Sequence, residues 1–268
     1  MKSNRNILFP AVLTLGAVFH ATSSTGAPDT GSGAGPGPGP KVAKTVVLVH
    51  GAFADGSSWN AVIPLLQAKG LKVIAVQNPL TSLADDVEFT NRAIKEAKGP
   101  VVLVGHSWAG AVITEAGDND KVKSLVYVAA FAPSVGQSVS DTAKAYPTPP
   151  GLANPLVDGA GFLKLSSESV MKYFAPDLPA AQANLIAITQ GAVRGMNFDE
   201  KLTKSAWQTK PSWYIVAEKD QMIDPAAERE AARKIKATTV SLPTSHVPML
   251  SKPKEVADVI IAAANNIK

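Results

Sequence analysis

The chain has 268 residues, of which 46% are hydrophobic and 18% charged, and its net charge is +4. This length suits one domain or one domain with an insertion. The absence of cysteine excludes disulfides, cysteine-ligated zinc, iron–sulfur clusters and a thiol nucleophile. Without the basic residues Lys2 and Arg5, which lie in an expected leader, the net charge falls to +2. No run of Lys and Arg then remains to indicate nucleic-acid binding.

The first 27 residues have the pattern of a secretory signal peptide. Lys2 and Arg5 precede an apolar run over residues 7–19, and small residues follow. The run is shorter than the ~20 residues that a membrane-spanning helix needs, so no stable membrane insertion is expected after processing. An uncleaved N-terminal anchor is the alternative. We therefore expect a secreted or periplasmic protein in which the Gly/Pro-rich residues 28–40 form a disordered linker.

Six short apolar runs rich in β-branched residues predict strands in the folded part, residues 41–268. The runs are continuous rather than alternating, which is typical of strands buried on both faces of a parallel sheet. The expected strands are Thr45–Val49, Lys72–Val76, Val101–Val104, Ser124–Ala130, Ser212–Val216 and Thr239–Leu242.

Helical segments alternate with these strands. Ser82 and Asp85 form a weak capping box at one helix start, and Asp224 precedes Pro225 at another. The alternation predicts an α/β fold with a mainly parallel, doubly wound sheet of about six strands. The expected helices are Ser58–Lys69, Ser82–Lys98, Pro225–Ile235 and Lys252–Ile267.

The alternation is interrupted between Ala132 and Trp207, where prolines are frequent and no convincing sheet strand occurs. We interpret this segment as a helical cap inserted between two strands, with helices near Ser167–Phe174 and Ala180–Gln190. Its aromatic side chains line a pocket or form the core of the cap itself, and they are Tyr146, Phe162, Tyr173, Phe174 and Phe198. The candidate pocket residues are Phe53, Tyr173 and Phe174.

The strongest catalytic signal is Gly105-His106-Ser107-Trp108-Ala109-Gly110, which connects a buried strand to a helix expected to begin near Ser107. So tight a turn forces the serine into a strained backbone conformation and presents its hydroxyl at the edge of the sheet. Small residues are needed on both sides because the two backbones approach closely. Ser107 is therefore the candidate nucleophile.

A second signal, His50-Gly51-Ala52, follows the first expected strand. A glycine at this position lets the chain turn so that the next N–H points into the cleft. The backbone N–H groups of Ala52 and Trp108 are the candidate oxyanion hole, in which one donor contributes roughly 3 kcal/mol of transition-state stabilisation.

A serine nucleophile needs a base, and the chain has four histidines. His20 lies in the leader, His50 at a strand end and His106 in the nucleophile turn. His246 follows the last expected strand, at the edge where an α/β sheet builds its site. His246 is therefore the candidate base.

The carboxylate that orients this base is expected after the preceding strand. Asp220 is the preferred candidate, and Glu218 and Asp224 are alternatives, although Asp224 has the position of a helix N-cap. Ser107, Asp220 and His246 then follow one another in the chain order of an α/β-hydrolase triad.

Together these motifs resemble the α/β-hydrolase fold superfamily over Lys41–Lys268. The compact chain is similar to the branch of esterases and hydroxynitrile lyases that includes plant methyl esterases. The resemblance implies a Ser-His-Asp triad, a cap and no cofactor. No metal is expected, because no His/Asp/Glu cluster has the spacing of metal ligands. We expect a serine hydrolase that cleaves a small carboxylic ester through an acyl-enzyme.

Three positions bear on the alternative functions of this fold. Lyase members typically have Thr as the second residue of the His-Gly motif and Lys after the catalytic His. This chain has Gly51 and Val247 at these two positions. Cofactor-free haloperoxidases or perhydrolases often have Met where this chain has Trp108. Lyase chemistry, perhydrolase chemistry and non-catalytic binding of a small molecule are the alternatives to ester hydrolysis. The sequence does not indicate an oligomeric state.

Overall fold

The computed structural model describes residues 44–267. The expected signal peptide, residues 1–27, and the expected linker, residues 28–40, lie outside the described residues. Among the residues described, no helix combines the length and the hydropathy that crossing a bilayer requires.

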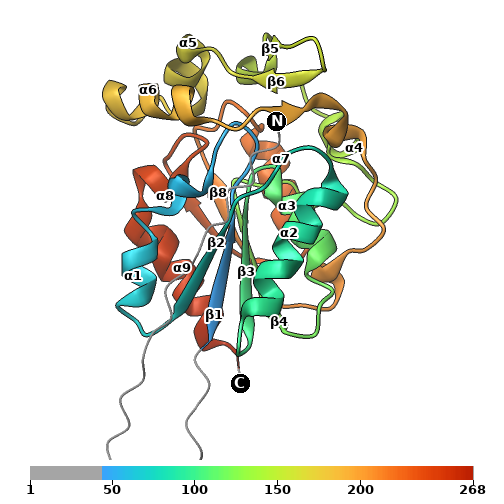
Figure 1. Cartoon of the computed structure of the whole chain (residues 1–268), viewed down its shortest axis with the longest axis vertical. Helices are drawn as coiled ribbons and strands as arrows, with labels where there is room; N and C mark the ends of the chain where they lie inside the picture. The colour runs from blue at the N-terminus through green and yellow to red at the C-terminus, as the bar shows by residue number, and fades with distance from the viewer. Residues whose placement is uncertain (1–43, 268) are drawn as a thin grey trace, which may run out of the picture. The chain divides into compact units, whose positions relative to one another are not determined.

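Six parallel strands form the central sheet in the order β2-β1-β3-β4-β8-β9 (Figure 1). Every residue of β1 and β3 is buried, as expected for continuous apolar runs covered on both faces. The strand number and the parallel pairing confirm the predicted fold class. The strands are β1 Thr45–Val49, β2 Lys72–Val76, β3 Val101–His106, β4 Val122–Val128, β8 Ser212–Ala217 and β9 Thr238–Leu242.

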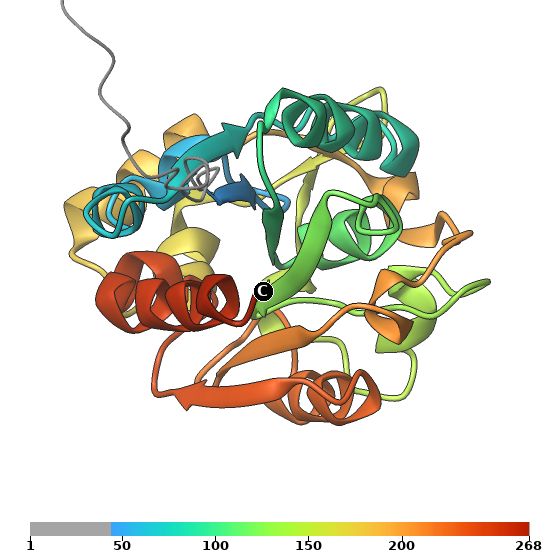
Figure 2. The ribbon, with the colours of Figure 1, turned by 90° about the horizontal axis from the view of Figure 1, so that it is seen from below.

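Helices cover both faces of this sheet. The helices α1 and α9 pack on one face, and α2, α3 and α7 pack on the other (Figure 2). The apolar stripe of α9, which includes Val256 and Ile260, is buried as its period predicts. The helices are η1 Gly56–Trp59, α1 Ile63–Gln67, α2 Leu83–Glu96, α3 Ala109–Ala116, α7 Pro225–Lys234, α8 Pro248–Ser251 and α9 Pro253–Asn265.

Two helix starts differ from the sequence expectation. The helix expected over residues 58–69 is divided into η1 and α1, and η1 begins before Ser58 because Asp55 caps it by accepting a hydrogen bond from Ser57 N at 2.7 Å. At α2, Ser82 Oγ accepts from Asp85 N at 3.0 Å as predicted. Asp85 does not complete the capping box, since its carboxylate accepts from Thr81 Oγ1 at 2.6 Å.

Most of the chain between β4 and β8 lies above the carboxyl ends of the central strands, and its last part, with η5, descends beside α3 to the start of β8 (Figure 1). The sequence indicated no strand here, yet three short strands form a separate antiparallel sheet in the order β5-β6-β7. Strands of two or three residues are too short to leave a readable period in the sequence. The elements are α4 Val139–Ala143, η2 Pro150–Leu152, β5 Leu156–Val157, β6 Phe162–Lys164, α5 Ser167–Ser169, η3 Val170–Phe174, α6 Ala180–Thr189, β7 Val193–Arg194, η4 Gly195–Asp199 and η5 Ala206–Gln208.

The strand order changes direction at β1, which has β2 on one side and β3 on the other. At such a switch point, the loops after two neighbouring strands diverge and leave a crevice at the carboxyl edge of the sheet. The loops after β1 and β3 begin at His50 and Ser107. The topology therefore brings the two sequence motifs to the same crevice.

Candidate active site

Ser107 occupies the turn between β3 and α3. Its φ of +53° lies in the left-handed region, which residues other than glycine rarely adopt. Because Ser107 is not helical, α3 begins at Ala109 and not near Ser107 as expected. A Cβ at Gly105 would lie 2.6 Å from the Ala109 oxygen, and one at Gly110 would lie 2.0 Å from the Phe131 oxygen. The strained turn thus depends on backbone contacts that only glycine permits.

Ser107, His246 and Asp220 form a continuous series of contacts. Nε2 of His246 lies 2.8 Å from Oγ of Ser107, and Nδ1 of His246 lies 2.5 Å from Oδ2 of Asp220. All three residues are buried. Loops that follow β3, β8 and β9 therefore bring the three candidate catalytic residues within hydrogen-bonding distance of one another.

The backbone fixes the Asp220 carboxylate. Its Oδ1 accepts hydrogen bonds from Met222 N at 2.6 Å and from Ile223 N at 3.0 Å. Both donors lie in the loop after β8, so the loop itself orients the carboxylate toward His246.

The two alternative acids have other partners. Glu218 Oε2 pairs with Arg229 Nη1 at 2.5 Å near the surface. Asp224 is the N-cap of α7, where its Oδ1 accepts from Ala226 N at 2.8 Å. Neither carboxylate contacts His246.

His106 and His50 brace the backbone around the site. Nε2–H of His106 donates to the His246 oxygen at 2.8 Å, and burial holds the pKa of His106 well below its usual value. Nδ1–H of His50 donates to the Gly51 oxygen, and its Nε2 accepts from Asn78 N, both at 2.9 Å. Burial lowers the pKa of His50 as well. Both imidazoles are therefore neutral supports.

The loop after β1 packs directly against the nucleophile turn. A Cβ at Gly51 would lie 2.8 Å from Ser107 Cβ and 2.8 Å from the His106 oxygen. Neither the Ala52 amide nor the Trp108 amide donates to a backbone carbonyl anywhere in residues 44–267. Two free N–H groups next to a serine hydroxyl are the donors that an oxyanion hole needs.

Asp86 of α2 is a residue of the site that the sequence did not reveal. Its Oδ2 accepts from Nε1–H of Trp108 at 2.7 Å, and its Oδ1 accepts from Leu80 N at 2.8 Å. Burial raises the pKa of Asp86 to about 6. From sequence, an acid in the first turn of a helix is usually interpreted as an exposed residue that interacts favourably with the helix dipole. Only the tertiary contact to Trp108 identifies it.

A cavity of about 230 Å³ opens onto Ser107 and His246. Phe53 lines it as expected, whereas Tyr173 and Phe174 do not. Phe174 is buried instead, with its ring edge-on to His246 at 5.2 Å between centroids. The lining is mostly apolar and consists of Phe53, Ser107, Phe131, Val139, Ser140, Ala143, Leu152, Pro155, Leu163, Phe198, Met222, Ile223 and His246.

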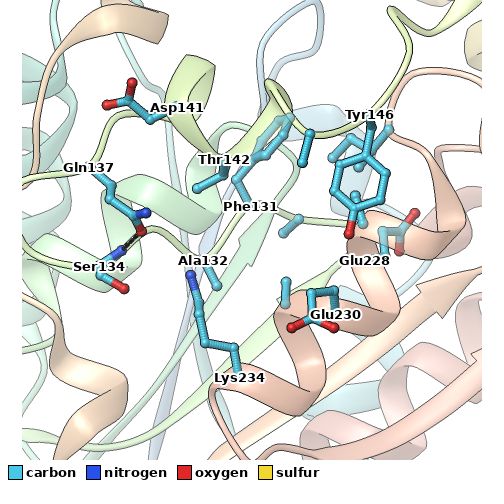
Figure 3. A pocket seen from close by; sticks show the side chains of 15 residues that line it. Phe131, Ala132, Ser134, Gln137, Asp141, Thr142, Tyr146, Glu228, Glu230 and Lys234 are labelled. Carbon is cyan, nitrogen blue, oxygen red and sulfur yellow. Dashed lines mark hydrogen bonds between the residues drawn. The ribbon is translucent and has the colours of Figure 1, made fainter.

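A second cavity of about 300 Å³ adjoins the first, and Figure 3 shows the residues that line it. The two cavities share Phe131 and Ile223 in their walls. Tyr146, which the sequence offered as a pocket aromatic, lines this second cavity. Its wall is more polar than that of the first and also includes Gln137 and Thr142. Two spaces of similar size therefore meet at one partition close to Ser107.

Comparison with known proteins agrees with this architecture. The model of the Alpha/beta hydrolase family matches residues 46–259. A pyrethroid hydrolase from Sphingobium wenxiniae is 29% identical over an alignment of 243 positions, which covers 80% of this chain and 85% of that protein. Methylesterase 2 from Arabidopsis thaliana is 27% identical over an alignment of 251 positions, which covers 82% of this chain and 95% of that protein.

Solved structures show the same arrangement of the chain. A crystal structure of a pyrethroid hydrolase superposes with a TM-score of 0.73 at 25% identity, covering 84% of this chain and 98% of that one. Polyneuridine aldehyde esterase gives a TM-score of 0.70 at 19% identity, covering 83% of this chain and 99% of that one. These likenesses confirm the α/β-hydrolase fold and the esterase-like branch that the sequence motifs predicted.

Proposed function

The chain belongs to the alpha/beta hydrolase family and is a carboxylic ester hydrolase, and we propose that it acts through an acyl-enzyme formed on Ser107. The observation that carries this proposal is the pair of contacts from Ser107 Oγ to His246 Nε2 and from His246 Nδ1 to Asp220 Oδ2. A hydroxyl, an imidazole and a carboxylate in this order are the parts of a serine nucleophile with its base and orienting acid.

The first half of the reaction forms the acyl-enzyme. Ser107 Oγ attacks the ester carbonyl carbon while His246 Nε2 takes the hydroxyl proton. Asp220 holds the imidazole by its other nitrogen and stabilises the positive charge that the proton brings. The Ala52 and Trp108 amides donate to the oxyanion of the tetrahedral intermediate. When the intermediate collapses, the protonated His246 gives its proton to the departing alcohol.

The second half repeats these steps with water. His246 takes a proton from a water molecule as the water oxygen attacks the acyl carbon, and it returns that proton to Ser107 Oγ when the carboxylic acid leaves. The free enzyme is then restored without a cofactor.

The cavity supports a small, neutral and largely apolar ester as the substrate. Its volume is about 230 Å³, and Ser107, Ser140 and His246 are the polar members of its wall. The residues that line it include no Asp, Glu, Lys or Arg. Apolar walls with a few directed polar groups favour a ligand of the same character.

The chemical test compares the wild type with Ser107→Ala on p-nitrophenyl esters. Loss of a triad nucleophile lowers turnover by several orders of magnitude, about 10⁶-fold where it has been dissected. A fluorophosphonate that adds its mass to the peptide containing Ser107 is the expected second result. Equal turnover by the two proteins contradicts the acyl-enzyme mechanism.

We also propose that the enzyme works outside the cytoplasm. Support comes from the sequence order of Lys2 and Arg5, the apolar residues 7–19 and the small residues after them. N-terminal sequencing of protein recovered from the medium or periplasm tests this, with a start between residues 24 and 28 expected. Intact residue 1 on protein retained in the cytoplasm contradicts it.

A further inference from the structure

The loop that carries His246 is hydrogen-bonded to the segment inserted between β4 and β8, called the inserted segment below. Asp177, between η3 and α6, accepts two hydrogen bonds from Ser245, the residue before His246. Ser245 N lies 2.9 Å from Asp177 Oδ2, and Ser245 Oγ lies 2.5 Å from Asp177 Oδ1. Ser245 is 1% exposed, whereas Asp177 is exposed, so the two donors are shielded from water while the carboxylate is partly solvated. A charged acceptor makes such hydrogen bonds stronger than neutral pairs.

A second contact of the same segment reaches His246 itself. The Phe174 ring stands edge-on to the His246 ring at 5.2 Å between centroids. Phe174 ends the π-helix η3, in which Ala175 N donates to the Val170 oxygen at 2.8 Å. Single π-helical turns are rare and are frequent at functional sites. The π turn ends at Phe174, which packs against His246, and Asp177 follows three positions later in the chain.

The loop that carries Asp220 is held by this segment as well. Gly151 N, in η2, donates to the oxygen of Gln221 at 3.0 Å, and Gln221 is the neighbour of Asp220. A Cβ at Gly151 would lie 2.1 Å from Met222 Sδ and 3.0 Å from Tyr173 Cβ. The segment therefore packs closely on the loops of both the base and its orienting acid.

We propose that Asp177 is a positioning residue for His246, so that the inserted segment clamps the catalytic base instead of only covering the substrate. The inference rests on the proposed role of His246 in ester hydrolysis. The Asp177 carboxylate fixes the backbone and the hydroxyl of Ser245, which sets the direction from which the imidazole reaches Ser107. A displacement of about 1 Å at a reacting group costs about 10²-fold in rate.

The main test is Asp177→Ala against Asp177→Asn. The alanine variant is expected to lose about 10²-fold in kcat with KM changed by less than about threefold, because the base is displaced while the cavity is intact. Asparagine restores both bonds: its oxygen accepts from Ser245 N, and its Nδ2 donates to Ser245 Oγ. Asp177→Asn is therefore expected within about threefold of wild-type kcat.

The matched control is Asp158→Ala. Asp158 lies in the same inserted segment and accepts from Ala160 N at 2.8 Å and Phe162 N at 2.9 Å, without touching either catalytic loop. Its loss removes two hydrogen bonds of the same kind, and wild-type kcat is expected. An equal fall of kcat in Asp158→Ala and Asp177→Ala overturns the proposal, since the effect then follows from loosening the segment in general.

Ser245→Ala keeps the test decisive if Asp177→Ala does not fold. This variant loses only the hydroxyl bond, and an intermediate fall in kcat is expected. Where both fold, the double variant is expected to be no slower than Asp177→Ala alone, because the two residues act as one unit. Wild-type kcat in Ser245→Ala, or independent effects of the two changes, overturns the proposal.

The rate of fluorophosphonate labelling at Ser107 separates this proposal from the proposed function. Labelling requires an activated serine but no ester substrate. If the wild type labels without hydrolysing esters, the proposed function fails, and slower labelling of Asp177→Ala than of Asp158→Ala still supports the clamp. Equal labelling rates in all variants contradict it.

Discussion

The indole N–H of Trp108 donates to the buried carboxylate of Asp86 at 2.7 Å, which anchors the residue after the proposed nucleophile, Ser107, to helix α2. The same Trp108 ring packs edge-on against Phe198 at 5.4 Å, and Phe198 lines the catalytic cavity. Asp86 thus supports both the proposed oxyanion donor at Trp108 and one wall of the cavity.

This contact predicts a pH dependence of stability. Burial raises the pKa of Asp86 from 3.8 to about 6, so the folded protein binds more protons than the unfolded chain between these values. The contribution of Asp86 to the free energy of unfolding is therefore largest below about pH 4 and falls as the pH rises to about 6. About two pKa units correspond to about 3 kcal/mol.

Urea unfolding of the wild type and of Asp86→Asn at pH 4.5 and pH 7 measures this effect. The stability of the wild type relative to the variant is expected to fall as the pH rises, because asparagine does not titrate. Asp85→Asn is the neighbouring control. Hydrogen bonds from Thr81 and Ser82 lower the pKa of the exposed Asp85, so its contribution to stability is lost as the pH falls, which is the opposite sign. If the free energies of unfolding of the wild type and Asp86→Asn change in parallel with pH, the prediction is refuted.

The acid that orients His246 is tested by three single changes. Asp220→Asn is expected to lower kcat by about 10⁴-fold, as loss of the orienting carboxylate does in serine hydrolases, because asparagine stabilises the wrong imidazole tautomer. Glu218→Gln breaks an exposed pair with Arg229, and Asp224→Ala removes an N-cap worth about 1 kcal/mol of stability. Both should keep wild-type kcat on a p-nitrophenyl ester, and a larger loss in either than in Asp220→Asn would reassign the acid.

The glycine of the His-Gly motif gives a steric prediction. A methyl group at Gly51 would lie 2.8 Å from Ser107 Cβ and from the His106 oxygen, so Gly51→Ala must push the β1 loop away from the nucleophile. We expect kcat to fall by about 10²-fold, the loss seen when one oxyanion donor is removed. Gly159→Ala, where nothing lies within 4 Å of the added Cβ, is the control. Normal turnover by Gly51→Ala would show that the Ala52 amide is not an oxyanion donor.

The central sheet was predictable because buried parallel strands leave continuous apolar runs, and β1 and β2 occupy the predicted residues. The nucleophile turn was predictable because its strain and its close contacts require particular small residues around Ser107. These patterns are local, so each can be recognised without knowledge of the rest of the chain.

Contacts between distant segments were not predictable in this way. Asp86 and Trp108 are 22 positions apart, and Asp177 and Ser245 are 68 apart. An isolated aspartate gives no sign of whether its partner is water or a buried donor. The same holds for two of the predicted pocket aromatics: Tyr173 and Phe174 do not line the cavity beside Ser107, and the Phe174 ring packs against His246 instead.

The partition between the two cavities predicts how substrate size can be changed. Phe131 and Ile223 line both the 230 Å³ cavity beside Ser107 and the neighbouring 300 Å³ cavity. Phe131→Ala removes most of one side chain from this wall and is expected to join the two spaces. Longer acyl chains then gain apolar contact, and each further buried methylene is worth about 0.8 kcal/mol, or roughly fourfold in kcat/KM. The ratio of kcat/KM for p-nitrophenyl octanoate over acetate should therefore rise by at least tenfold.

Tyr146→Ala is the control, because it enlarges only the second cavity and should leave that ratio near its wild-type value. If Phe131→Ala lowers both rates without changing their ratio, the two cavities act as separate spaces and Phe131 does not limit the length of the substrate.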